Sequence, residues 1–418
     1  MQREGPILSH SNTHDLPPAP AGVMTARAWL AVLSLTLGSF SFVTSEFLPV
    51  GILPQVSQSF GISPGAAGLM MTIPGMLAAL SAFGVMLLAG NADRRRVLQL
   101  LSLLLVLSSL LAAWGPSYAV VLVSRVLLGI GLGAFWALSL AVTSRLVPAS
   151  AVPMAASAVF GGVTAAMIFG VPLGTYLAEA FSWRAAFLVT AALAALALAM
   201  QLWALPPLKT ASSLKLASLA QFMRQPPALK SIATIVLVFI AQFGAYTYLA
   251  PLVQRVGISG NTLTALLLGY GIAGFIANFL VPRLAAKSVK FTLAGAVGLL
   301  MLSLLALPAT DSPAVTMALV MLWGVAWGAL PLSLNLAHRQ VPGGQTEAAS
   351  ATFTGVIQVA IAIGAGLGGV LVDSAGVGAD FLAAGLFALL ALLMALGVHT
   401  RAGSHARNMR TECCDGVH

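Results

Sequence analysis

The sequence predicts an all-α membrane protein whose twelve transmembrane helices form two six-helix pseudo-repeats. Three observations lead to this fold class: the composition, the number of apolar segments, and a repeat that relates the two halves of the chain. Hydrophobic residues make up 59% of the 418 residues, and charged residues make up only 7%. A soluble domain carries about 25% charged residues, so this chain has too few of them to keep its surface in water.

Apolar segments punctuated by glycine, proline and charged residues define the candidate helices. A helix needs roughly 20 apolar residues to cross the hydrocarbon core of a bilayer. Twelve segments come close to that length, near residues 28–52, 65–89, 97–114, 118–142, 152–178, 184–205, 231–250, 262–283, 291–308, 313–337, 348–372 and 378–399. The chain is therefore predicted to cross the membrane twelve times, beginning with a retained helix rather than a cleaved signal peptide.

The positions of Lys and Arg predict the orientation. If the N-terminus is cytoplasmic, all of these residues except Arg125, Arg184 and Arg255 fall in cytoplasmic loops and tails, as the positive-inside rule requires. Both termini are therefore predicted to be cytoplasmic. The predicted parts of the chain are a cytoplasmic N-terminal tail (1–27), a first six-helix half (28–205), a cytoplasmic central loop (206–230), a second six-helix half (231–400) and a cytoplasmic C-terminal tail (401–418).

The two halves resemble each other in sequence. Ala155–Val163 and Ala348–Val356 have the sequences AASAVFGGV and AASATFTGV. The glycines of the fourth and tenth spans also correspond, Gly129 with Gly324 and Gly133 with Gly328. Many secondary transporters consist of such repeats, with the substrate held between them near the middle of the membrane.

Glu46 is the only acidic residue well inside a predicted span, because the other acids lie in tails, loops or span ends. An ionised carboxylate is costly in hydrocarbon, so such a residue usually faces a cavity or a partner. In the repeat it corresponds to the neutral Tyr248. We expect Glu46 to bind protons or substrate; the alternative is a neutral carboxyl that only packs between helices.

Arg125 is the basic counterpart, and it corresponds to Val320 in the repeat. Its guanidinium keeps its charge, so it must be paired or hydrated. Its predicted depth is similar to that of Glu46, which favours a direct or water-bridged pair. The alternative is an arginine that extends to the membrane surface along its own helix.

Two further groups are candidates for controlling conformation. Asp93 and Arg94 lie in the loop between the second and third spans, where they could cap a helix or close the cytoplasmic side; topology alone would explain the arginine. Small residues and a proline in the fifth span could form a hinge or only permit close packing: Gly161, Gly162, Gly170, Pro172 and Gly174.

Polar side chains within other spans are candidates for lining a central cavity, namely Gln242, Tyr246, Tyr248, Asn278, Asn335 and Gln358. A Walker loop, a metal-ligand cluster and a nucleophile–base pair are missing from the sequence. The basic residues sit in short loops and form no stripe interleaved with aromatic residues, which argues against nucleic-acid binding. We therefore expect a transporter, not an enzyme, without a cofactor or metal.

Together, the twelve spans, the Asp93–Arg94 loop and the helix that carries Arg125 resemble the major facilitator superfamily over about residues 27–400. The segment Thr44–Gly51, TSEFLPVG, is similar to the opening helix of bacterial drug:proton antiporters of the arabinose- and sugar-efflux, purine-ribonucleoside-efflux and chloramphenicol-efflux type. Gly170–Gly174 resembles the antiporter motif on the fifth helix of that group, with Val171 inserted before the proline.

The resemblance implies a monomeric, multi-pass protein of the bacterial inner membrane that exports a small organic solute, such as a drug, sugar or nucleoside. Its two halves would rock against each other, and inward proton flow would supply the energy. The expected partners are the small-molecule substrate, protons and the lipid bilayer. The alternative within transport is an uncoupled facilitator or a proton-coupled importer, and residue chemistry alone does not set the direction.

The orientation can be tested with single cysteines in a protein whose Cys413 and Cys414 are replaced by serine. Ser312→Cys should react with a membrane-impermeant maleimide in intact cells, whereas Ser212→Cys should react only after the cells are permeabilised. Reaction of both, or the reverse pattern, would contradict the predicted topology.

Overall fold

A computed structural model of the chain describes residues 25–88, 92–208, 226–339 and 346–397. Within these ranges the chain is helical and contains no β-strand. Twelve of the described helical segments are long and apolar enough to cross a membrane. The predicted fold class, an all-α protein with twelve spans, is confirmed.

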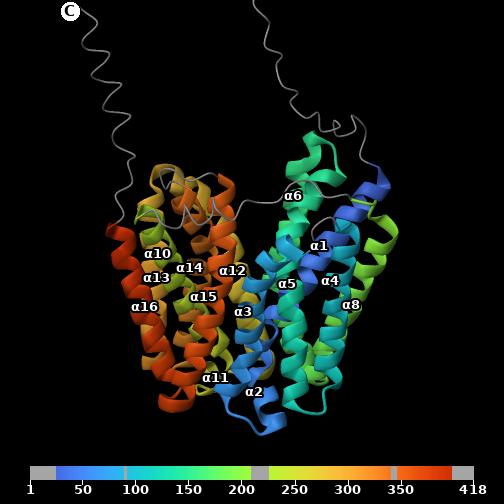
Figure 1. Ribbon diagram of the computed structural model, residues 1–418. Helices are drawn as coiled ribbons and strands as arrows, with labels where there is room; N and C mark the ends of the chain where they lie inside the picture. Colours follow the sequence, from blue (N-terminus) through green and yellow to red (C-terminus); the bar gives the residue numbers. More distant parts are fainter. Residues whose placement is uncertain (1–24, 89–91, 209–225, 340–345, 398–418) are drawn as a thin grey trace, which may run out of the picture.

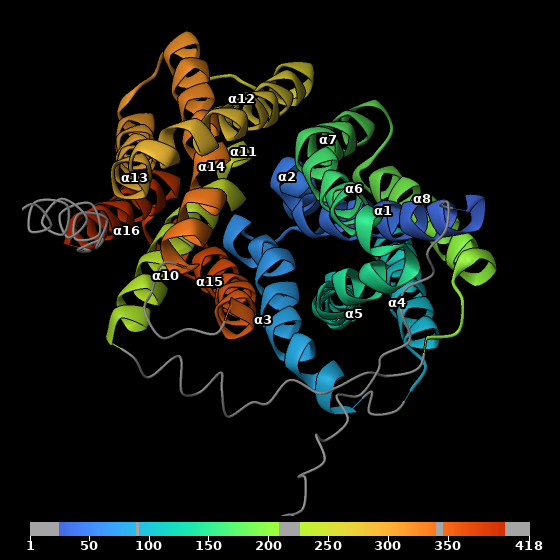
Figure 2. The same cartoon turned by 90° about the horizontal axis from the view of Figure 1, so that it is seen from above.

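The first half contains α1 (Ala26–Phe47), α2 (Pro49–Phe60), α3 (Pro64–Leu88), α4 (Arg94–Trp114), α5 (Tyr118–Leu146), α6 (Val152–Ala165), α7 (Val171–Ala180) and α8 (Trp183–Ala204). The second half contains α10 (Pro226–Thr247), α11 (Leu249–Gln254), α12 (Gly260–Lys287), α13 (Val289–Ala306), α14 (Pro313–Arg339), α15 (Thr346–Ala375) and α16 (Val377–Gly397). Short turns are the 3₁₀-helices η1 (Ala149–Ala151) and η3 (Leu307–Ala309) and the π-helix η2 (Ala166–Gly170). Figure 1 and Figure 2 show the two halves as separate groups of helices.

The corresponding glycines make the same helix crossing in each half. In α5, a Cβ atom on Gly129 would lie 2.7 Å from the carbonyl oxygen of Pro74 in α3. In α14, a Cβ atom on Gly324 would lie 2.6 Å from the carbonyl oxygen of Tyr270 in α12. Such contacts are too close for any side chain, so glycine is what allows these helices to touch. The structural equivalence agrees with the sequence repeat.

The first span of each half is interrupted by a helix break. The sequence predicted these spans, 28–52 and 231–250, as continuous helices. α1 ends at Phe47 and α2 continues from Pro49 to Phe60; in the second half α10 ends at Thr247 and α11 begins at Leu249. Proline removes a backbone donor and clashes with the preceding turn, and Pro49 stands directly after the first break. The fifth span is likewise interrupted, by the π-helical turn η2 between α6 and α7.

The halves meet most closely at one end of the bundle. We call this the sealed end, formed by α2, α11 and the first turn of α3; the opposite end, where α1 begins and α16 ends, is the terminal end. In Figure 1 the two groups of helices converge near α2 and α11 and diverge towards the terminal end. Asp373 of α15 joins the halves at the sealed end, because it accepts hydrogen bonds from Ser63 Oγ (2.6 Å) and Gly65 N (2.8 Å).

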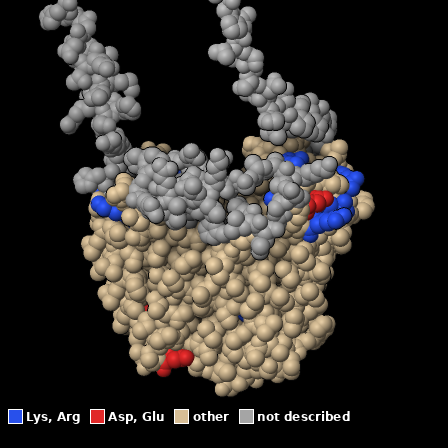
Figure 3. Space-filling view, viewed as in Figure 1, with Lys and Arg blue, Asp and Glu red and all other residues tan. Residues whose placement is uncertain are grey.

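Charged side chains avoid the middle of the bundle surface. Figure 3 shows blue Lys and Arg residues near the terminal end and an almost entirely tan belt below them. The helices beneath this belt are the twelve candidate spans. An uncharged belt of this kind is what a protein embedded in hydrocarbon presents to lipid, so the chain is a multi-pass membrane protein.

Candidate functional site

The break after α1 creates a backbone acceptor in the centre of the bundle. In a continuous helix the carbonyl oxygen of Ser45 would accept a hydrogen bond from the N–H of residue 49. Residue 49 is proline, which has no N–H group. Arg125 of α5 supplies the missing donor, with its Nη1 atom 3.0 Å from the Ser45 oxygen.

The Arg125 side chain is fully enclosed, with 0% of its surface exposed. Its guanidinium lies 4.6 Å from the centre of the Phe187 ring in α8, and its Nε atom donates to Ser124 Oγ at 3.3 Å. The Nη2 atom is buried without a hydrogen-bond partner in the described structure. The alternative in which Arg125 extends to the membrane surface therefore does not describe this conformation.

Glu46 lies next to Ser45 and is 4% exposed. Its Oε1 atom accepts a hydrogen bond of 3.2 Å from Nε2 of Gln358 in α15. Two residues that the sequence analysis selected separately thus meet across the interface of the halves. Among the described residues, no hydrogen bond or ion pair joins Glu46 to Arg125. Arg125 contacts the α1 backbone one residue before Glu46, so the direct form of the expected direct or water-bridged pair is not made in this conformation.

Aromatic rings surround this junction. Phe47 of α1 stacks on Phe243 of α10, with ring centres 5.3 Å apart, and Phe243 meets Trp327 of α14 edge-on at 5.4 Å. The sequence analysis did not select these three residues, because isolated aromatic residues in apolar helices have no distinguishing signal. Phe47 directly follows Glu46 in the chain, so its stacking on Phe243 adds an apolar contact between the halves next to the Glu46 backbone.

The predicted cavity residues have different positions. Gln242 is buried in the second half, where it accepts from Trp323 Nε1 (2.7 Å) and donates to the Tyr270 hydroxyl (2.9 Å). Tyr246 is also buried and stacks on Tyr270 with ring centres 5.1 Å apart. The Gln242 amide is therefore satisfied within the second half, and Tyr246 packs beside it through its ring.

Two of the other predicted cavity residues are less buried than Gln242 and Tyr246. Asn278 is exposed and Asn335 is half-buried. Asn278 follows Gly271 by two helical turns, which places both on one face of α12; a Cβ atom on Gly271 would lie 2.9 Å from Ile168 of the first half. Asn278 is therefore on the face that α12 turns towards the first half.

The fifth-span glycines pack against α1. Added Cβ atoms at Gly162 and Gly170 would collide with Thr36 and Thr44 of α1, and one at Gly174 would collide with Leu48, which directly follows α1. Gly161 differs, because nothing lies within 4 Å of an added Cβ atom there. The motif thus brings α6, η2 and α7 against the helix that carries Glu46. Pro172 is buried in the first turn of α7, immediately after the π-helical turn.

Asp93 anchors the terminal end of the first half. It caps α4 by accepting from Arg95 N (2.9 Å), and it also accepts from Leu208 N (2.8 Å), which follows α8. Arg94 N donates to the Leu208 oxygen. Burial raises the pKa of the Asp93 carboxyl, but the two backbone hydrogen bonds and the charges of Arg96 and Arg95 outweigh it, so the pKa is lowered. The anchoring therefore persists at neutral pH and is lost only as the pH falls through this lowered pKa.

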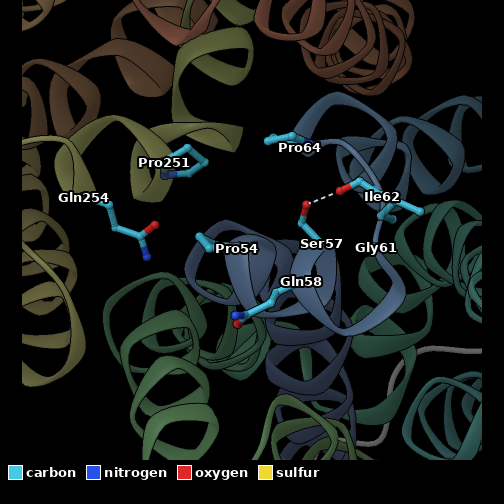
Figure 4. Close-up of a pocket in the computed structure, with 8 residues that line it drawn as sticks. All are labelled: Pro54, Ser57, Gln58, Gly61, Ile62, Pro64, Pro251 and Gln254. Carbon is cyan, nitrogen blue, oxygen red and sulfur yellow. Dashed lines mark hydrogen bonds between the residues drawn. The ribbon is translucent and has the colours of Figure 1, made fainter.

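A hollow of about 390 Å³ lies at the sealed end, between α2, the start of α3 and α11 (Figure 4). It is lined by Pro54, Ser57, Gln58, Gly61, Ile62, Pro64, Pro251 and Gln254. Ser57 Oγ donates to the carbonyl oxygen of Ile62 beside it. The lining contains no charged side chain, so this hollow is not where Glu46 or Arg125 acts.

The sequence analysis placed Asp380 at the end of a span, but the structure buries it as deeply as Glu46. Asp380 lies in the first turn of α16 and is 2% exposed. The helix packs one of its first residues inwards because α10 and α15 cover that turn. Glu46 is therefore not the only enclosed acid among the described residues.

The chain matches the family described as Major Facilitator Superfamily over residues 35–360. It is 33% identical over 376 residues to the purine ribonucleoside efflux pump NepI of Escherichia coli O6:K15:H31 (strain 536 / UPEC), covering 90% of this chain and 95% of that protein. The pump of the same name from Shigella sonnei (strain Ss046) shows the same identity and coverage.

Solved structures with the same fold include a bacterial homologue of the human lysosomal transporter Spinster in an inward-facing and unoccupied conformation. Its TM-score is 0.72 at 14% identity, over 89% of this chain and 97% of that one. A D-xylose-proton symporter gives a TM-score of 0.72 at 18% identity, over 91% of this chain and 100% of that one. At these identities the likeness concerns the fold.

The packing of the fifth span on α1 predicts different effects for two adjacent glycines. Gly162→Ala places a methyl group against the Thr36 backbone oxygen, which cannot rotate away, so we expect a loss of about 1–3 kcal/mol of stability. Gly161→Ala, the control, enters open space and should be neutral or slightly stabilising. Thermal unfolding of the purified proteins in detergent measures both, and equal effects would contradict this packing.

Proposed function

The chain belongs to the major facilitator superfamily, and we propose that it exports a small organic solute of the purine ribonucleoside type in exchange for protons by alternating access. The observation that carries this proposal is Glu46, an enclosed carboxyl that is hydrogen-bonded across the two halves to Gln358. The solute class follows from the relatives that are 33% identical and are named as purine ribonucleoside efflux pumps.

Glu46 has the position that a proton carrier requires. It lies where the halves meet, so a movement between them changes both its hydrogen bond to Gln358 and its access to water. A carboxyl loads a proton when it is enclosed in apolar surroundings and releases it when hydrated or approached by positive charge. Arg125, held one residue away on the backbone of α1, supplies that charge. We infer a cycle in which proton binding at Glu46 and solute binding alternate.

Aromatic and amide groups near Glu46 suit a nucleoside. Stacking of a base on an aromatic ring contributes about 1–3 kcal/mol in other base-binding proteins. Phe47, Phe243 and Trp327 are buried against one another in this conformation, and they would offer such a surface once the halves move apart. Gln358 can exchange its hydrogen bond with Glu46 for one with the polar edge of a base. Protonation of Glu46 and solute binding then compete for the same amide, which is what exchange requires.

The structure suits a conformation open towards the terminal end, which we assign to the cytoplasm. The halves are joined at the sealed end through Asp373, whereas Asp93 bonds only within the first half among its described hydrogen bonds. Arg94 Nη1 is buried there without a hydrogen-bond partner in the described residues. In the opposite conformation, Asp93 and Arg94 would contact the second half and close the cytoplasmic side. A monomer in the bacterial inner membrane, energised by the proton gradient, is sufficient for this cycle.

Replacing Glu46 tests proton coupling. Glu46→Gln keeps the shape of the side chain but cannot release a proton, so proton-driven transport of a purine ribonucleoside should fall to background while downhill movement persists. Substrate-induced proton release from reconstituted vesicles measures the coupling directly. Glu179→Gln is the matched control, because Glu179 is an exposed acid whose described hydrogen bond is with Gln55. Intact accumulation by Glu46→Gln would exclude the carrier role, and failure of every nucleoside tested on wild type would exclude the solute class.

Replacing Asp93 tests the gate. Asp93→Asn removes the charge but keeps one oxygen for the cap, so anchoring should weaken by no more than about 0.5–2 kcal/mol. We expect slower turnover with nearly unchanged substrate affinity, because the residue acts on conformation and not on the solute. Transport rates together with equilibrium binding to purified protein separate the two effects. A large loss of affinity at normal turnover would place this loop in the binding site.

A further inference from the structure

Asp380 is an enclosed acid that the proposed cycle does not use. It lies in the first turn of α16, at the sealed end, with 2% of its surface exposed. Its Oδ2 atom is buried and has no hydrogen-bond partner in the described structure. Leaving an ionised oxygen in this state costs much more free energy than leaving a neutral one, so its surroundings determine which form persists.

Glycines of two neighbouring helices enclose the carboxyl. A Cβ atom at Gly368 of α15 would lie 2.9 Å from Asp380 Oδ1, and one at Gly244 of α10 would lie 3.6 Å from it. A side chain at position 368 would press against the carboxyl, whereas position 244 lies at ordinary contact distance from it. The site is therefore formed by α10, α15 and α16 together, and by no single helix.

The ionisable groups around Asp380 do not neutralise it. Tyr248 lies beside it between α10 and α11, Asp373 follows on α15, and Arg255 at the end of α11 approaches the backbone near Gly378. Among the described residues, none of the three is joined to Asp380 by a hydrogen bond or ion pair. The ionisable residues of the neighbouring helices α13 and α14 lie at the terminal end of the bundle: Lys290, His338 and Arg339.

Tyr248 connects Asp380 to the contact between the halves. A Cβ atom at Gly368 would touch both Asp380 and the Tyr248 ring, the latter at 2.9 Å. The Tyr248 hydroxyl donates to the Ala365 oxygen at 3.0 Å and lies directly against Gly68 of α3, in the first half. The Tyr248 ring thus stands between the carboxyl and the first half, and separation of the halves at this end would admit water next to Asp380.

We propose that Asp380 is a second proton-binding site, which takes up a proton from the water at the sealed end when that end closes and returns it when that end opens. The proposal rests on the alternating access described above, but not on proton coupling through Glu46. Closure removes the carboxylate from water without providing a hydrogen-bond donor, so Asp380 is protonated in the closed form. Opening hydrates the carboxyl, and the proton then leaves to the water on the same side. Asp380 therefore adds no proton to the transport count and makes closure dependent on the pH outside.

The direction of this dependence follows from the closed form. Asp380 is neutral there, so acid favours closure. Asp373 lies at the same end and accepts hydrogen bonds from Ser63 and Gly65 of the first half, so Asp373→Asn is a control that alters the contact between the halves and leaves Asp380 in place.

The test measures opening of the sealed end. Thr72→Cys places a thiol on α3 facing Gly366 of α15. The background protein carries Glu46→Gln, and its Cys413 and Cys414 are replaced by serine. In intact cells, an impermeant maleimide labels this thiol, and the labelling rate is divided by the fraction of thiol that is ionised at each pH. This corrected rate should rise with external pH, by at most about tenfold per pH unit for one proton. Asp380→Asn should label slowly at every pH, whereas Asp373→Asn should keep the rise. An unchanged rise in Asp380→Asn, or a rate that falls with pH, would overturn the proposal.

A second measurement needs no substitution. A hydrophobic carbodiimide reacts with protonated carboxyls in apolar surroundings, and peptide mass spectrometry locates the adduct. In the wild-type chain at neutral pH, Asp380 should be modified and the exposed Glu179 should not. An unmodified Asp380 would overturn the proposal even if the Asn variant failed to fold. Neither measurement requires transport, so failure of the proposed export function would leave these outcomes interpretable.

Discussion

The hydrogen bond from Arg125 to the Ser45 carbonyl is the contact on which the centre of the bundle depends. Pro49 follows the end of α1 inside the helix bundle and leaves that carbonyl without its helical donor. An unsatisfied backbone group costs several kcal/mol in hydrocarbon, and a buried guanidinium is costly without an acceptor. Each group therefore compensates the other. The result is a fixed break directly beside Glu46, which gives the carboxyl a defined position between the halves.

Close helix contacts supply the rest of the positioning. Helices in a bilayer gain little from hydrophobic burial against each other and associate through van der Waals packing at small residues. The glycines of the fifth span hold α1 on one side, and those of α5 hold α3 in the same half. Phe47 and Glu46 then project towards α10 and α15 of the other half. Close contacts also cross between the halves, at Gly68 of α3, which lies against Tyr248, and at Gly271 of α12, which lies against Ile168. A movement of the halves about their interface must separate or slide these contacts.

The two halves share their helix arrangement because of the sequence repeat, and they differ in their buried titratable residues. Both halves break their first helix and cross their second and fourth spans through equivalent glycines. Among the described residues, only the first half has a carboxyl and a guanidinium at the break. In the second half Tyr248 occupies the position equivalent to Glu46. The buried acid of that half, Asp380, lies on a different helix, α16. The two halves thus present unlike titratable groups, one at the centre and one near the sealed end.

The sequence by itself determined the twelve spans and the repeat, and it selected Glu46, Arg125 and Gln358 as candidates, because charge and polarity in long apolar helices are visible without a structure. The link between Pro49 and Ser45 was also available from their spacing of four residues. Tertiary structure alone decided that Arg125 contacts the backbone of α1 and not Glu46, that Gln358 reaches Glu46, and that Asp380 is enclosed. Spacing along a helix fixes depth in the membrane, but which faces meet depends on rotation and packing against helices distant in the chain.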